Sequence, residues 1–130
     1  MKNILIIEDA GVRGNSLRNN FEDHNYNIIV SNVVSQNQWV LRENVPNVII
    51  LDCLSDKGLE LCKRFKQDRS SRTVPVIIIN SENKLQYMVQ AYEAGADYCL
   101  VKNEEGSKSL QLLIDSILTR QSRKNLTMSA

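Results

Sequence analysis

Four short apolar runs, each ended by a polar residue, constrain the fold of this chain more than any other feature. They lie at residues 4–7, 48–51, 76–79 and 98–101 and are rich in isoleucine and valine. Continuous apolar runs of this length, rich in β-branched residues, are typical of strands that are buried on both faces. The runs therefore predict a sheet covered by helices on both sides.

The polar residues that end these runs predict a functional edge. They are Glu8 and Asp9, Asp52, Asn80, and Lys102. If the strands are parallel, their carboxyl ends lie along one edge of the sheet, where α/β proteins bind ligands. Any buried run must end in something polar, and that alternative explains each terminus taken alone. This alternative explains the whole set less well, because three acids and one lysine at one edge are the charges that a catalytic or ligand-binding site uses.

Helical periodicity fills the segments between the runs. A further short strand, residues 28–30, has less apolar character and is expected at an edge of the sheet. The alternation of strands and helices predicts an α/β fold with right-handed crossovers. The expected helices are residues 11–23, 35–44, 58–66, 85–94 with Gly95 as the C-cap, and 106–120.

Length and composition restrict the remaining possibilities. The 130 residues allow one domain, expected at 1–120, with 121–130 as a flexible tail or the start of a linker. A net charge of +1, with no basic stripe, argues against nucleic-acid or membrane binding. The amino terminus has neither a signal peptide nor a spanning segment, so a cytoplasmic location is expected. The three cysteines form no C-x-x-C pair and suggest neither disulfides nor zinc.

The acids at the predicted edge require a cation, because carboxylates forced together repel one another. Lys102 supplies one positive charge, and a divalent ion held by Asp9, Asp52 and water, with Glu8 nearby, would supply the rest. Oxygen ligands that leave room for water favour Mg²⁺. Asp52 would then be the nucleophile that accepts a phosphoryl group, with Lys102 and the Asn80 amide neutralising its oxygens.

Several motifs resemble the receiver domain of two-component response regulators over residues 1–119: residues 4–9, 47–52, 58–62, 74–78, and 94–98 through Lys102. The resemblance implies a flavodoxin-like, doubly wound parallel sheet with strand order 2-1-3-4-5. It also implies that Asp52 takes a phosphoryl group from a sensor histidine kinase or phosphotransfer protein with Mg²⁺. Glu8 and Asp9 match the acidic metal pair, the Leu54 backbone carbonyl matches a further metal ligand, and Lys102 matches the family's lysine.

Three positions depart from the family pattern. Asn80 stands where the family usually has threonine or serine. Cys99 stands where an aromatic residue is usual, with Tyr98 shifted by one place and so expected on the opposite face of the strand. The loop between Asp52 and Gly58 is shorter and lacks the family's proline. The resemblance together with these departures predicts an atypical receiver, one that differs from the family at the positions that relay the signal.

Two hypotheses follow. In the first, a phosphorylated receiver signals to a downstream protein through the face of the fourth helix, fifth strand and closing helix, where Tyr87, Tyr92 and Tyr98 offer contacts. The resemblance also admits a homodimer. In the second, the domain is a phosphorylation-independent interaction module. A phosphatase is disfavoured because Leu54 occupies the position where such enzymes carry a general acid, so no turnover enzyme is expected.

Overall fold

The computed structural model describes residues 2–8, 26–32, 45–53, 56–80, 84–102 and 104–129, and within the last range it describes the side chains of residues 108–124. The helices predicted at 11–23 and 35–44 lie outside the described residues, and so do Asp9 and Leu54.

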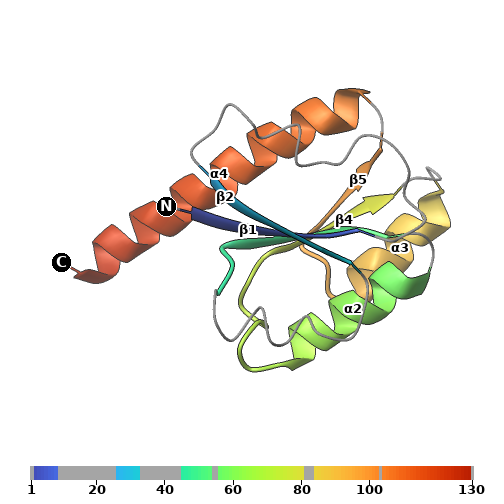
Figure 1. Ribbon diagram of the computed structural model, residues 1–130, viewed down its shortest axis with the longest axis horizontal. Helices are drawn as coiled ribbons and strands as arrows, with labels where there is room; N and C mark the ends of the chain where they lie inside the picture. Colours follow the sequence, from blue (N-terminus) through green and yellow to red (C-terminus); the bar gives the residue numbers. More distant parts are fainter. Residues whose placement is uncertain are drawn as a thin grey trace.

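Five parallel strands form one sheet (Figure 1). Their order is β2-β1-β3-β4-β5, as the resemblance implied, and β2 is an edge strand as predicted. Together with the helices this is the flavodoxin-like architecture. The strands are β1 (Lys2–Glu8), β2 (Tyr26–Asn32), β3 (Val48–Asp52), β4 (Val76–Asn80) and β5 (Tyr98–Val101).

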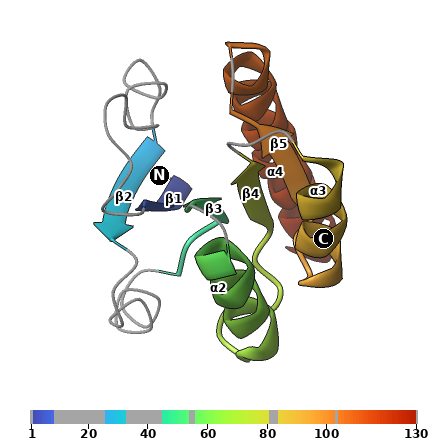
Figure 2. The ribbon, with the colours of Figure 1, turned by 90° about the vertical axis from the view of Figure 1, so that its right-hand side faces the viewer.

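Three helices are described: α2 (Asp56–Gln67), α3 (Leu85–Glu93) and α4 (Glu104–Ser129). The sheet divides the core into two clusters, one on each face, because successive strand residues point to opposite sides. The helices cover these clusters. On one face α2 and α3 cover Leu5, Leu51 and Ile78, and on the other α4 covers Ile4, Ile50 and Ile77 (Figure 2). The strand residues are almost completely buried, which explains why they appear in the sequence as continuous apolar runs.

The two faces also separate Cys99 from Tyr98. Cys99 belongs to the cluster beneath α2 and α3, whereas Tyr98 packs against the cluster beneath α4. The predicted opposite orientation of these neighbours is therefore confirmed. The position at which the receiver family usually has an aromatic residue is occupied by a small buried thiol.

α3 ends in a Schellman motif. Ala94 is the C-cap, and Gly95 follows it with a φ of 100°. The Gly95 N–H donates to the Tyr92 carbonyl (3.0 Å) and the Ala96 N–H donates to the Ala91 carbonyl (3.1 Å). Gly95 thus ends the helix as predicted, one residue after the cap itself.

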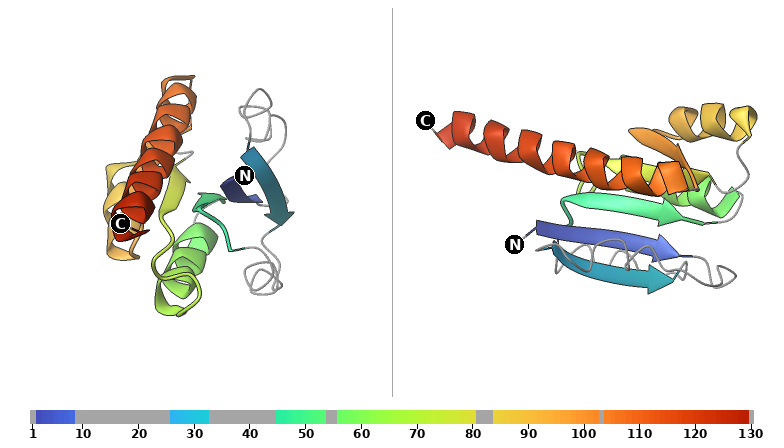
Figure 3. Two further views of the ribbon diagram at one scale, coloured as in Figure 1. Left: turned by 90° about the vertical axis from the view of Figure 1, so that its left-hand side faces the viewer. Right: turned by 90° about the horizontal axis from the view of Figure 1, so that it is seen from above.

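The closing helix is longer than predicted. α4 continues to Ser129, so residues 121–129 are helical where a flexible tail was expected; whether they begin a linker stays a prediction. Beyond Gly106 the segment contains no glycine or proline, so the helix persists after its apolar stripe ends. The Gln121 amide also donates to the Asn47 backbone carbonyl (2.9 Å) and accepts a hydrogen bond from the Asn47 side chain (3.3 Å), which holds the helix against the residue that precedes β3. Figure 3 shows α4 extending past the amino ends of the strands.

Candidate functional site

The carboxyl ends of four strands, β1, β3, β4 and β5, lie at one edge of the sheet. Glu8 at the end of β1 is paired in register with Asp52 at the end of β3. On the other side, Asn80 at the end of β4 is paired with Val101, and the Asn80 carbonyl accepts a hydrogen bond from the Lys102 N–H (3.0 Å). The strand register thus brings four of the predicted site residues to the same edge.

Asp52 and Lys102 form an ion pair across this edge. The Lys102 Nζ lies 2.9 Å from Oδ2 and 3.3 Å from Oδ1 of Asp52. The Asp52 side chain is only 3% exposed, whereas that of Lys102 is 34% exposed. A carboxylate this deeply buried needs a hydrogen-bonded cation to offset its lost hydration. Lys102 supplies that cation from the solvent side, so its ammonium lies where a group arriving at Asp52 would meet it.

Asn80 connects the site to the start of α3. Its side chain is almost completely buried, and Nδ2 donates a hydrogen bond to the backbone carbonyl of Lys84 (3.2 Å). Lys84 is the N-cap of α3 but makes no capping hydrogen bond with its own side chain. The amide predicted to contact a phosphoryl group therefore links the last residue of β4 to the N-cap residue of α3.

The metal-binding prediction is covered in part by the described residues. Glu8 and Asp52 lie next to each other, while Asp9 and Leu54 fall outside the description. Within the described ranges no three histidine, cysteine or acidic side chains are grouped closely enough to hold a metal ion. The donors that are present are carboxylate oxygens beside a single lysine, and this chemistry fits Mg²⁺ better than a soft metal.

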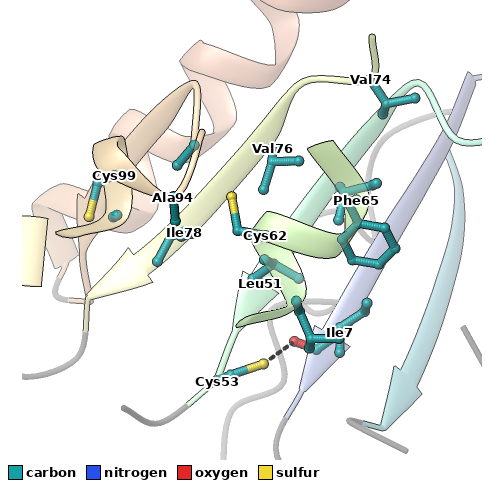
Figure 4. Close-up of a cluster of buried hydrophobic side chains, with 14 of the residues drawn as sticks. Ile7, Leu51, Cys53, Cys62, Phe65, Val74, Val76, Ile78, Ala94 and Cys99 are labelled. Atoms are coloured by element: carbon teal, nitrogen blue, oxygen red, sulfur yellow. Dashed lines mark hydrogen bonds between the residues drawn. The ribbon is translucent and has the colours of Figure 1, made fainter. Parts of the chain in front are cut away.

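A cluster of buried hydrophobic side chains on one face of the sheet contains all three cysteines (Figure 4). Cys53 follows Asp52 directly, is 4% exposed and donates through Sγ to the Ile7 carbonyl (3.6 Å). Cys62 and Cys99 belong to the same cluster. Burial raises the pKa of Cys62 to about 11 and also raises that of Cys99, so these thiols stay protonated at neutral pH. They are packing groups.

Tyr87 reaches into this cluster from α3, although the sequence suggested that it faces outward. A Cβ built on Gly58, in the first turn of α2, would lie 3.3 Å from the Tyr87 hydroxyl oxygen. Burial is the main cause that raises the pKa of Tyr87 to about 12. The sequence signal for this position is indirect: Cys53, Gly58 and Cys99 are all small and leave room for one large ring.

The outer face of α3 carries an exposed apolar stripe made of Leu85 (76% exposed), Val89 (49%) and Tyr92 (48%). Of the tyrosines predicted for this face, only Tyr92 is exposed, and its hydroxyl accepts a hydrogen bond from the Cys99 N–H (3.3 Å). Leu112 on α4 is also exposed (71%). The residues of this stripe have the spacing of one helical face, so the sequence predicts that they lie on the same side of the helix. The sequence does not show that this side faces outward.

Comparison with known proteins agrees with this geometry. A family model described as "Response regulator receiver domain" matches residues 4–114. A protein named histidine kinase P4 from Formosa agariphila is 30% identical over 92% of this chain, which spans 9% of that protein. The response regulator ArlR from Staphylococcus saprophyticus is 29% identical over 97% of this chain and 56% of its own length. The chain thus corresponds to a small part or about half of these relatives.

A solved structure gives the same result for the fold. The signal receiver domain of a signal transduction histidine kinase from Syntrophus aciditrophicus superimposes with a TM-score of 0.75 at 25% identity, covering 92% of this chain and 91% of that domain. Among the described residues, no helix is long and apolar enough to span a membrane.

Proposed function

We propose, from the premise that this chain belongs to the response regulator receiver family, that Asp52 accepts a phosphoryl group and that the domain relays the resulting state through protein contacts. The observation that carries the proposal is the arrangement around Asp52. Its buried carboxylate ends β3 opposite Glu8 and receives the ammonium of Lys102 at 2.9 Å. An acidic nucleophile beside a second acid and one lysine suits transfer of a highly charged group.

In the proposed reaction a carboxylate oxygen of Asp52 attacks the phosphorus of a phosphohistidine. The new O–P bond forms as the N–P bond breaks, and the imidazole that leaves takes up a proton from water. Lys102 is already within hydrogen-bond distance of the attacking group and is placed to neutralise one phosphoryl oxygen. Glu8, Asp52, Asp9 and the Leu54 carbonyl would hold Mg²⁺, which neutralises the other phosphoryl oxygens when bound.

The relay would begin at Asn80. Its buried amide donates a hydrogen bond to the Lys84 carbonyl at the start of α3. A phosphoryl oxygen that accepts a hydrogen bond from this amide would compete with that carbonyl. A ligand shifts a conformational equilibrium by its differential affinity for the two states, and a phosphoryl oxygen offers Asn80 a charged acceptor in place of a neutral one. The exposed stripe on α3 is then the surface that a downstream protein would recognise.

The partners of this role are a sensor histidine kinase or phosphotransfer protein upstream and a protein target downstream. We also propose that these contacts take place in the cytoplasm and that a second copy of the chain is a candidate partner for the same face. The domain would act as a signalling module with a single acceptor site and would not turn over a substrate of its own.

The test is incubation with Mg²⁺ and a small phosphodonor, followed by intact mass measurement. We expect a single phosphoryl adduct on the wild type and none on Asp52→Ala. Asp56→Ala is the matched control, because Asp56 is an exposed acid in the first turn of α2 and should leave the adduct intact. Absence of the adduct from the wild type would refute phospho-acceptance and favour the phosphorylation-independent interaction module.

A further inference from the structure

α3 is anchored to the rest of the domain by few buried groups. Ala91 is its only fully buried residue, although the helix spans Leu85–Glu93. Tyr87 and Met88 are partly buried, and Tyr92 holds the end of the helix through its hydrogen bond with the Cys99 N–H. A helix held by so little buried surface can shift at low cost in free energy. The contacts that remain therefore decide where α3 lies.

Tyr87 links α3 to the segment that carries Asp52. A Cβ on Gly58 would lie 3.3 Å from the Tyr87 hydroxyl oxygen, 3.5 Å from Cys53 Cβ and 3.9 Å from the Cys53 carbonyl oxygen. The phenol tip therefore lies next to the first turn of α2, at a glycine that also adjoins Cys53, the residue bonded to Asp52. Movement of Gly58 displaces Tyr87 directly, because protein interiors are close-packed and leave no slack between touching groups.

The surrounding side chains explain why a ring fits there. Cys53, Gly58 and Cys99 are all small; Cys53 directly follows β3, Gly58 lies in α2 and Cys99 lies in β5. The ring contributed by α3 fills space that larger residues at these positions would occupy. Tyr87 thus forms a single side-chain connection among three elements that surround the acceptor edge.

We infer that Tyr87 is a positioning residue that couples Cys53, next to Asp52, and Gly58, in the first turn of α2, to the placement of α3. Through α3 it is coupled to the stripe of Leu85, Val89 and Tyr92. The inference rests on the proposed function for the signal that moves Cys53 and Gly58 in the cell. The coupling itself is a property of the packing, so it can also be measured without phosphorylation.

The experiment follows hydrogen exchange of the α3 amides in response to two perturbations of the acceptor segment. One is addition of Mg²⁺ and beryllofluoride, a phosphoryl mimic, and the other is Asp52→Asn. We expect each to change α3 exchange rates by about twofold to thirtyfold in the wild type. The change should be clearly smaller in Tyr87→Ala, where the Asn80–Lys84 hydrogen bond still connects the site to α3. Gln86→Ala is the matched control, because this residue is exposed on α3 outside the stripe and should preserve the response.

The outcomes separate the inference from the proposed function. If beryllofluoride does not change hydrogen exchange around Asp52 in the wild type, phospho-acceptance is refuted, and the Asp52→Asn variant still tests the coupling. The inference is overturned if the α3 response has the same size with and without Tyr87. It is also overturned if Asp52→Asn alone does not change α3 exchange.

A second pair of variants covers the case in which Tyr87→Ala does not fold. Gly58→Ala places a methyl group 3.3 Å from the Tyr87 hydroxyl oxygen, so that oxygen must move by a few tenths of an ångström. In Tyr87→Phe the oxygen is gone, and the next contact is an ordinary 3.5 Å to Cys53 Cβ. Gly58→Ala should therefore change α3 exchange in the wild type but not in Tyr87→Phe. The same change in both backgrounds would overturn the coupling.

Discussion

Replacing Gly95 with alanine should destabilise the domain at the point where α3 ends. Gly95 has a φ of 100°, a conformation that residues with a Cβ rarely adopt. An alanine Cβ would also lie 3.0 Å from Lys66 Cγ. Lys66 cannot easily move away, because its Nζ donates to the Val74 carbonyl (2.9 Å) and to Asp97 Oδ2 (2.7 Å). The substitution therefore strains both the backbone and this ion pair.

The magnitude follows from three terms. A left-handed conformation costs a non-glycine residue about 1–2 kcal/mol. Disturbing the Lys66 hydrogen bonds adds up to about 1.5 kcal/mol, and the lower entropy of the unfolded alanine chain returns about 0.4–1 kcal/mol. We expect a net loss of about 1–2 kcal/mol in the free energy of unfolding, or a Tm lower by about 3–8 °C.

Urea unfolding followed by circular dichroism measures this loss, with Gly58→Ala as the control. Gly58 lies inside α2 and has no positive φ, so alanine gains up to about 1 kcal/mol of helix propensity there, against a tight contact with Tyr87. The control should thus cost clearly less than Gly95→Ala. A Gly95→Ala variant as stable as the wild type, or no less stable than Gly58→Ala, would refute the reasoning.

Three further predictions concern charge and protonation. Lys102→Met should slow formation of the Asp52 adduct on the order of a hundredfold in a mass-spectrometric time course, and an unchanged rate would exclude its role in transfer. All cysteines should react slowly with an aromatic disulfide reagent in the folded protein and fully in denaturant, because they are buried and the pKa of Cys62 is about 11. Stability to urea should fall as pH rises from 9 to 12, because burial raises the pKa values of three groups on folding. The pKa of Cys62 rises from 9 to about 11, and those of Tyr26 and Tyr87 rise from 10 to about 12. The unfolded chain then loses these protons first, and Tyr87→Phe should flatten the decline.

The sheet could be predicted from the sequence because its strands are buried on both faces. Such strands must be continuously apolar and must end abruptly, so their ends at Glu8, Asp52 and Asn80 could be identified residue by residue. Strand order came from the family resemblance, since apolar runs alone do not say which strands are neighbours. The structure adds the register that pairs Glu8 with Asp52.

The packing of α3 could not be predicted in the same way. Leu85, Met88, Val89 and Tyr92 give a clear helical period, yet the structure buries Ala91 and turns Leu85 and Val89 outward. A small residue lets the helix approach the sheet closely, so hydrophobicity alone indicates the wrong side. The inward position of Tyr87 depends on the small size of residues on β3, α2 and β5, which are distant in sequence.

The unequal anchoring of the two helices beside β5 indicates which of them a phosphoryl group can move. α4 buries Leu110, Ile114, Ile117 and Leu118 and is held at Gln121 by hydrogen bonds with Asn47. Exposing four such side chains would cost at least about 6 kcal/mol, at about 1.5 kcal/mol or more for each. Allosteric coupling free energies are typically about 1–3 kcal/mol, which is too little to displace α4. Displacing α3 costs a free energy within this range, because Ala91 is its only fully buried residue. Occupation of the Asp52 site should therefore move α3 while α4 stays in place.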